Sequence, residues 1–172
     1  MALTQQFARV TREYLEHCRS SAFDSPEASP GWDPSPGDLL DTDWAVWGLI
    51  WYCRSTGADV DLIALLDRAV SGDPGGDIGF LDHDEVYDGI DGPPRLLAPA
   101  AVVEIARGLE AVDLDIVLAD LPSAAADAAA ACGFGDGFSG DVREYVAEHF
   151  TAMVEFYSAA ARRGQCVVVW VD

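Results

Sequence analysis

The chain has 172 residues and a large excess of acidic side chains: thirty Asp and Glu against ten Arg and no Lys, for a formal net charge of -20. Such a charge repels phosphate backbones and anionic lipid headgroups, which argues against binding to nucleic acid or to a membrane surface. Half of the residues are apolar, which is enough for the core of one domain of this length.

The first strand and helix are predicted close to the N-terminus. Phe7, Ala8, Arg9 and Val10 alternate like a short strand, and Thr11 is a typical cap for the helix that follows it. No basic region followed by an apolar stretch is found here, as a secretory signal would require, so we expect a cytoplasmic protein.

The segment 23–38 contains four Pro and two Gly, and we predict an irregular surface loop there. A helix is expected over 44–54, capped by the acidic and hydroxyl side chains of 41–43. Its apolar residues point in all directions, which is typical of a buried helix. Gly57 ends it, and Asp59 begins a second, amphipathic helix.

The segment 73–91 is predicted to be an acidic loop, because it is rich in Gly and holds seven Asp and Glu residues. Leu96 and Leu97 form a candidate short strand, and Pro99 suits the first turn of a helix that runs to about Ala111. The next segment, to residue 121, is ambiguous between helix and strand.

The last third of the chain is predicted to be mostly helical. Ser123 is the expected cap of an Ala-rich helix, and a long helix begins near Asp141 and ends at Gly164. The apolar run 167–171 predicts a strand covered on both faces. Together the elements predict a single compact α+β domain over 1–172, in which five to six helices surround a small sheet that includes the N- and C-terminal strands.

The segment 135–140 matches the letters of a dinucleotide-binding loop, G-x-G-x-x-G. The context differs from such a loop, because an Ala-rich helix precedes it where a buried strand is needed, and Asp136 would repel a pyrophosphate. The four cysteines are far apart and lack zinc-finger spacing, so we expect them to be unpaired. No cofactor or metal is predicted from these patterns.

The acidic loop holds most of the candidate binding residues. Its carboxylates occupy nearly alternate positions, which is reminiscent of a calcium loop, but the required turn glycine is replaced by Tyr87. A solvated acidic loop is therefore the simpler interpretation, with a pair of Asp82 and His83 as general base left as a possibility. The candidates in this loop for binding a partner or ligand are Asp82, His83, Asp84, Glu85 and Asp88.

Two further candidates lie outside the loop. Arg95 follows seven acidic residues, and we predict that its guanidinium pairs with one of them. Trp47 shares one helical stripe with Trp44 and Trp51, which fits core packing or the lining of a ligand pocket.

The segment 92–102, GPPRLLAPAAV, resembles the middle of the YfbM-like family of uncharacterised bacterial proteins, with its Gly-Pro-x-Arg turn, short apolar strand, Pro and helix. Three further features agree with this resemblance in their order along the chain. They are the helix start at 43–49, the aromatic and Ala-rich end of the last helix, and the closing strand with Trp170. It implies a compact bacterial α+β domain and no known activity. Family members often have Trp-His where Val46 and Trp47 stand.

The sequence favours a non-catalytic binding protein for a basic partner, such as an antagonist or immunity-type protein that covers a nuclease-type toxin. The acidic charge is the basis of this expectation. No nucleophile elbow of the form G-x-S-x-G is found in the sequence. The alternative is a small hydrolase or metal-dependent enzyme centred on 82–95.

Overall fold

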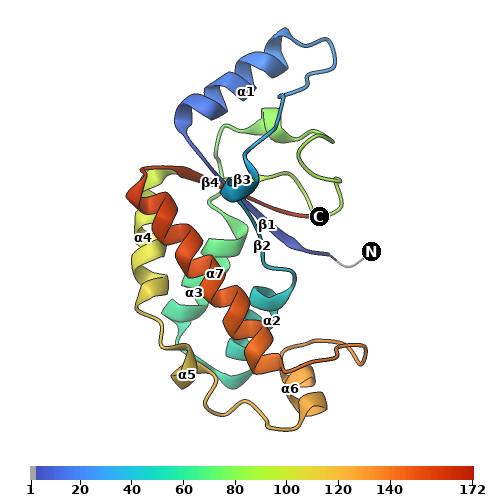
Figure 1. Ribbon diagram of the computed structural model, residues 1–172, viewed down its shortest axis with the longest axis vertical. Helices are drawn as coiled ribbons and strands as arrows, with labels where there is room; N and C mark the ends of the chain where they lie inside the picture. Colours follow the sequence, from blue (N-terminus) through green and yellow to red (C-terminus); the bar gives the residue numbers. More distant parts are fainter. Residues whose placement is uncertain (1–2) are drawn as a thin grey trace.

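The computed structural model describes residues 3–172 as a four-stranded antiparallel sheet with helices on both faces (Figure 1). The strand order is β2-β1-β4-β3, so the N- and C-terminal strands lie in the middle. The elements are β1 Gln5–Val10, α1 Arg12–Asp24, the 3-10 turn η1 Pro36–Asp38, β2 Leu39–Asp41, α2 Ala45–Thr56, α3 Val60–Ser71, the 3-10 turn η2 Gly79–Leu81, β3 Arg95–Leu97, α4 Pro99–Glu110, α5 Leu114–Val117, α6 Ala125–Ala131, α7 Val142–Arg162 and β4 Cys166–Val171.

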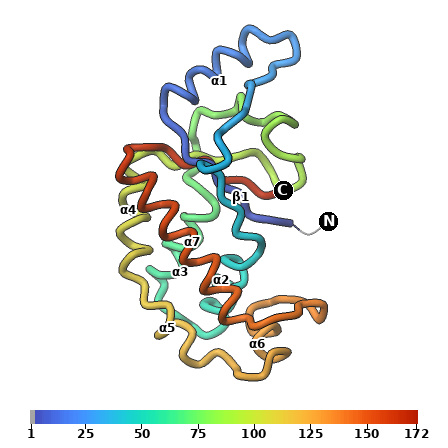
Figure 2. Tube along the Cα trace, in the orientation of Figure 1, coloured from blue at the N-terminus to red at the C-terminus, as the bar shows by residue number. Residues whose placement is uncertain are grey.

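Strand β4 is buried along its whole length. Its side chains alternate between two apolar cores: Val167 and Val169 belong to the core under α2, α3, α4 and α7, while Val168 and Trp170 belong to the core under α1 and the acidic loop. The start of β1 and the C-terminal residue lie side by side, since Thr4 and Asp172 exchange backbone hydrogen bonds of 2.6 and 3.0 Å (Figure 2). The predicted α+β domain, with its C-terminal strand covered on both faces, is thus confirmed.

The larger core lies between the sheet and the long helix α7. Phe150, Met153 and Tyr157 are buried on one face of α7, as the three- and four-residue spacing predicts. The fully buried Tyr157 hydroxyl donates to the Ala69 carbonyl oxygen at 2.5 Å, which links α7 to α3. A helix both long and apolar enough to cross a membrane is not found within residues 3–172.

The sequence predicted the cap of α1 and the starts of α3 and α7 correctly, and the caps of α2 and α6 wrongly. Thr11 accepts from Tyr14 N–H, and the side chains of Asp59 and Asp141 cap α3 and α7 in the same way. Ser123 does not cap α6, because the chain enters that helix one residue later, at Ala124. The expected cap at 41–43 is also wrong: the N-cap position of α2 is Trp44, without a side-chain bond.

The Pro- and Gly-rich segment 23–38 is mostly irregular, as expected. The sequence did not predict β2, the short edge strand that follows it, because Leu39, Leu40 and Asp41 carry no strand-like alternation. The ambiguous segment after α4 contains the single-turn helix α5. The acidic loop is anchored at its start by an isolated bridge between Asp73 and Leu96.

Candidate functional site

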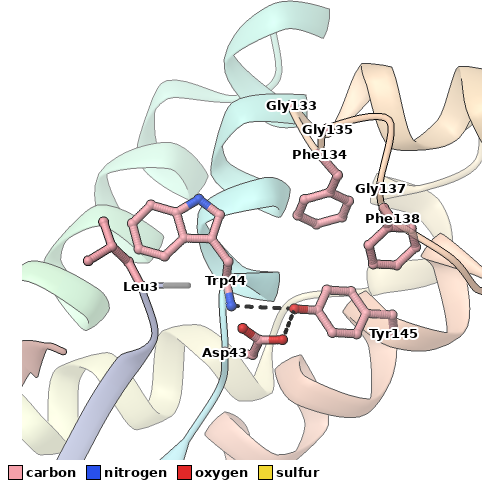
Figure 3. A pocket seen from close by; sticks show the side chains of 9 residues that line it. All are labelled: Leu3, Asp43, Trp44, Gly133, Phe134, Gly135, Gly137, Phe138 and Tyr145. Carbon is pink, nitrogen blue, oxygen red and sulfur yellow. Dashed lines mark hydrogen bonds between the residues drawn. The ribbon is translucent and has the colours of Figure 1, made fainter. Parts of the chain in front are cut away.

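An aromatic pocket lies where the start of α2 meets the loop between α6 and α7 (Figure 3). Its volume is about 540 Å³, within the range of small-ligand sites. Three segments far apart in the sequence provide its walls. The larger side chains that line it are Leu3, Asp43, Trp44, Phe134, Phe138 and Tyr145.

A hydrogen bond between Tyr145 and Asp43 joins two walls of the pocket. The Tyr145 hydroxyl donates to Asp43 Oδ2 at 2.7 Å and accepts from the Trp44 backbone N–H at 3.3 Å. Asp43 has a φ of 50°, a left-handed conformation uncommon for a residue with a side chain. Two bonds hold it there: its N–H donates to Asp41 Oδ1 at 2.6 Å, and its carbonyl oxygen accepts from Gln5 N–H at 2.9 Å.

The aromatic rings of the pocket pack against one another in favourable geometries. Phe134 and Phe138 are stacked with ring centroids 4.9 Å apart, and Tyr145 meets Phe138 edge to face at 5.1 Å. Trp44 is stacked on Trp47 at 5.6 Å. Such pairs each add about 0.5–1.5 kcal/mol beyond the area they bury, so the walls are held in place before any ligand arrives.

Gly48 of α2 allows the ring of Phe134 to lie directly on the helix. A Cβ atom at Gly48 would lie 2.2 Å from Phe134 Cζ, far inside van der Waals contact. On the next turn of α2, the indole of Trp51 lies against Gly133 and remains 59% exposed. The aromatic surface therefore continues from the pocket onto the outside of the protein.

Trp47, one of the predicted site residues, supports the pocket from behind. Its Nε1 donates to Gln5 Oε1 at 2.9 Å, and Gln5 Nε2 donates to the Trp170 carbonyl oxygen at 2.9 Å. Gln5 is fully buried, so its amide needs these partners. The network fixes α2 on the sheet and so fixes Trp44, which stacks on Trp47.

The chemistry of the pocket is that of aromatic faces beside one carboxylate. Burial and, second, the hydrogen bond to Asp43 raise the pKa of Tyr145 well above its usual value, so the phenol stays protonated and remains a donor. His149 Nδ1 lies 2.8 Å from the Tyr145 carbonyl oxygen, so its ring has a polar partner on its own helix. Aromatic faces and a carboxylate both attract a cation.

Trp47 and Arg95 border a second pocket of about 280 Å³, together with Asp91. Arg95 is exposed and makes no ion pair within residues 3–172, so the predicted pairing with an acidic-loop carboxylate is wrong. Arg68 takes that role instead: its Nε lies 2.7 Å from Asp73 Oδ1. Arg68 lies in the last turn of α3, five positions before Asp73 at the start of the loop.

Three candidates of the acidic loop, Asp84, Glu85 and Asp88, border a third pocket of about 510 Å³. The Glu85 carboxylate accepts from the Ser29 hydroxyl at 2.5 Å and from Gly31 N–H at 3.1 Å. The bond from Ser29 is the main cause of a lowered pKa for Glu85. This carboxylate therefore ties the acidic loop to the Pro-rich segment.

Asp82 and His83 have separate partners. Tyr87 donates its hydroxyl to Asp82 Oδ1 at 2.5 Å, and this bond is the main reason why the pKa of Tyr87 rises to about 12. His83 Nδ1 lies 3.0 Å from Asp84 Oδ1, and its Nε2 lies 3.3 Å from the Glu27 carbonyl oxygen. For the described part of the chain, no group of three His, Cys, Asp or Glu side chains is arranged to hold a metal ion.

The four cysteines are free and buried, as the sequence predicts. Burial is the main cause that raises the pKa of the Cys53 and Cys132 thiols to about 11, so both are protonated at neutral pH. They act as small apolar side chains of the core.

Most of the aromatic pocket is not predicted from the sequence. The sequence indicates Asp43 only as part of a helix cap, and the segment 135–140 only as a match to the letters of a dinucleotide-binding loop. One signal was available: Phe134 and Phe138 stand in a loop too rich in Gly to continue a helix, and large apolar side chains in such loops pack on another element or on a ligand.

Residues 1–170 match the family described as Domain of unknown function (DUF1877). The chain belongs to this family. The crystal structure of a protein of unknown function, YfbM from Escherichia coli, is similar to it with a TM-score of 0.60 at 15% sequence identity, over 98% of this chain and 99% of that chain. The sequence resemblance to the YfbM-like family is thus confirmed, and at this identity the similarity shows a shared fold. A search of curated proteins gives no significant match.

Proposed function

We propose that this member of the family is a non-catalytic binding protein for a basic protein partner in the bacterial cytoplasm. The observation that carries the proposal is the unbalanced acidic surface. Six of the thirty acidic side chains pair with an arginine within residues 3–172: Glu16, Asp38, Asp67, Asp73, Asp77 and Glu104. Most carboxylates are thus available to attract positive charge from outside.

A broad negative field speeds the encounter with a basic protein and disfavours nucleic acid and anionic membranes. A concrete form of this function is an antagonist that covers the nucleic-acid site of a nuclease-type toxin with carboxylates. The aromatic pocket adds apolar contact area to the attraction between charges. In protein interfaces a few buried residues, often aromatic, provide most of the binding energy.

The acidic loop supports the alternative, a small hydrolase or metal-dependent enzyme, less well. The Asp82 and Glu85 carboxylates already accept hydrogen bonds from the Tyr87 and Ser29 hydroxyls. Arg95, at the end of the same segment, borders a different pocket from Asp84 and Glu85. Side chains of one active site would converge on one cavity.

The experiment that tests the proposal is capture of the partner from the source bacterium at low salt, followed by purification and binding with the two pure proteins. An unrelated protein of similar net charge serves as the control for non-specific attraction. We expect a basic partner that binds this protein and not the control. A stoichiometric complex with an acidic partner, or turnover of a small molecule by the pure protein, would contradict the proposal.

A further inference from the structure

We infer that the aromatic pocket beside Asp43 binds an arginine side chain of the basic partner. This inference rests on the proposed function, because it names the anchor point of that partner. Whereas the net charge indicates only a basic partner, this inference names the aromatic pocket, the Asp43 carboxylate and an arginine side chain as the contact.

The arrangement of the pocket suits a cation. Trp44, Phe134, Phe138 and Tyr145 border a volume of about 540 Å³, and the faces of such rings attract a cation. A cation within about 6 Å of such a ring centroid is attracted by roughly 0.5–2 kcal/mol. Among the described residues, none that lines the pocket carries a basic side chain that would compete for these positions.

Asp43 supplies the matching negative charge. Its Oδ2 accepts from the Tyr145 hydroxyl, while Oδ1 accepts no hydrogen bond within the described residues. One carboxylate oxygen is thus oriented by the protein, and the other can accept from a ligand. The raised pKa of Tyr145 agrees with a neutral phenol that donates to an ionised Asp43.

Arginine fits this site better than lysine. A guanidinium is planar, stacks on aromatic faces and is weakly hydrated, so it loses less on entry into an apolar pocket than an ammonium does. It also presents several N–H donors to a carboxylate in a fixed geometry. The exposed indole of Trp51, which lies against Gly133 at the rim, adds a surface of the residue type most common at interface hot spots.

The test uses three tripeptides that differ only at the central residue: acetyl-Gly-Arg-Gly-amide, the same peptide with lysine, and the same peptide with citrulline. Citrulline has nearly the shape of arginine without its charge. Binding is followed by NMR through the Trp indole and Tyr signals at millimolar peptide. We expect the arginine peptide to bind most tightly, with shifts at Trp44 and Tyr145, and the citrulline peptide to bind about tenfold more weakly.

The matched variants are Asp43→Asn and Asp24→Asn, which change the net charge equally. Asn tolerates the left-handed backbone of Asp43, so the first variant keeps the fold. Asp24 is exposed at the end of α1, at the opposite end of the molecule from α6 (Figure 1). We expect Asp43→Asn to weaken arginine binding about tenfold and Asp24→Asn to leave it unchanged.

Equal binding of the arginine and citrulline peptides, or equal losses in the two variants, would overturn the inference. Failure of this inference can be distinguished from failure of the proposed function. A basic partner whose binding ignores Asp43→Asn refutes the arginine pocket alone. An arginine peptide that binds in the pocket of a protein with an acidic partner supports the pocket and refutes the proposed function.

Discussion

The Tyr145 hydroxyl donates to Asp43 Oδ2 at 2.7 Å, although 102 positions separate the two residues in the sequence. The bond links the first turn of α7 to the residue before the N-cap of α2, and it joins two walls of the aromatic pocket (Figure 3). It orients a carboxylate in an apolar setting, where a charge has its largest effect on a ligand. The left-handed backbone of Asp43 is part of the same arrangement.

Gly48→Ala should destabilise the protein, although Ala favours a helix over Gly by about 1 kcal/mol. The new methyl group would lie 2.2 Å from Phe134 Cζ, so the ring has to leave its place on α2. We expect a net loss of about 1–3 kcal/mol in the free energy of unfolding, measured by denaturant titration.

Gly135→Ala is the matched control, because it lies in the same pocket and a Cβ there meets nothing within 4 Å. Its free energy of unfolding should stay within about 0.5 kcal/mol of the parent. A gain in stability for Gly48→Ala would show that Phe134 does not pack on the helix as described.

The stability of the protein should fall steeply above about pH 10, the usual pKa of tyrosine. Folding raises the pKa of all five tyrosines. The pKa rises to about 12 at Tyr14, mainly because of burial, and to about 12 at Tyr87, mainly because of its bond to Asp82. The folded protein then keeps protons that the unfolded chain has lost, so this contribution is complete below pH 10 and is lost as the pH rises through the folded pKa.

Denaturant titrations between neutral pH and about pH 11, with tyrosinate absorbance as a second signal, measure this loss. Tyr145→Phe should reduce the slope above pH 10, because one of the raised groups is gone. A free energy of unfolding that is constant across this range would contradict the buried and bonded positions of these phenols.

Arg95→Ala should change the free energy of unfolding by less than about 0.5 kcal/mol, because Arg95 is exposed and has no ion-pair partner within residues 3–172. Arg68→Ala is the comparison, since Arg68 bonds to both Asp73 and Glu104. It should cost about 1 kcal/mol, the upper range for exposed pairs. The reverse order of the two losses would show that Arg95 holds a structural contact.

We expect the acidic loop to bind no divalent cation tightly. Tyr87 and Ser29 already donate to Asp82 and Glu85, and within residues 3–172 no three His, Cys, Asp or Glu side chains are arranged to hold a metal ion. Isothermal titration with Ca²⁺, Mg²⁺ and Zn²⁺ measures this directly. A stoichiometric micromolar site that disappears in Asp84→Ala would favour the enzyme alternative.

The fold was largely predictable because its elements carry local signals. The β-branched run of β4 and the amphipathic pattern of α3 identify these elements from neighbouring residues alone. Edge strand β2 and the cap of α2 were not predictable in this way. The conformation of Asp43 depends on Gln5 and Tyr145, which come from opposite ends of the chain.

The aromatic pocket was not predictable for the same reason. Its walls come from three segments that have different local patterns, and contact between them depends on how α7 crosses α2. Except for Trp47, the predicted site residues were chosen because they are titratable and close in sequence. The structure places five of the seven at two other pockets: Trp47 and Arg95 border one, and Asp84, Glu85 and Asp88 border the other.

The most direct test of the binding function is the association rate constant with the purified partner as a function of salt. The Debye length falls from about 30 Å at 0.01 M to about 8 Å at 0.15 M ionic strength, so attraction between a surface of charge -20 and a basic partner weakens across this range. As the ionic strength rises, we expect a steep fall in the association rate constant and a nearly constant dissociation rate constant. An association rate that is indifferent to salt would contradict this expectation.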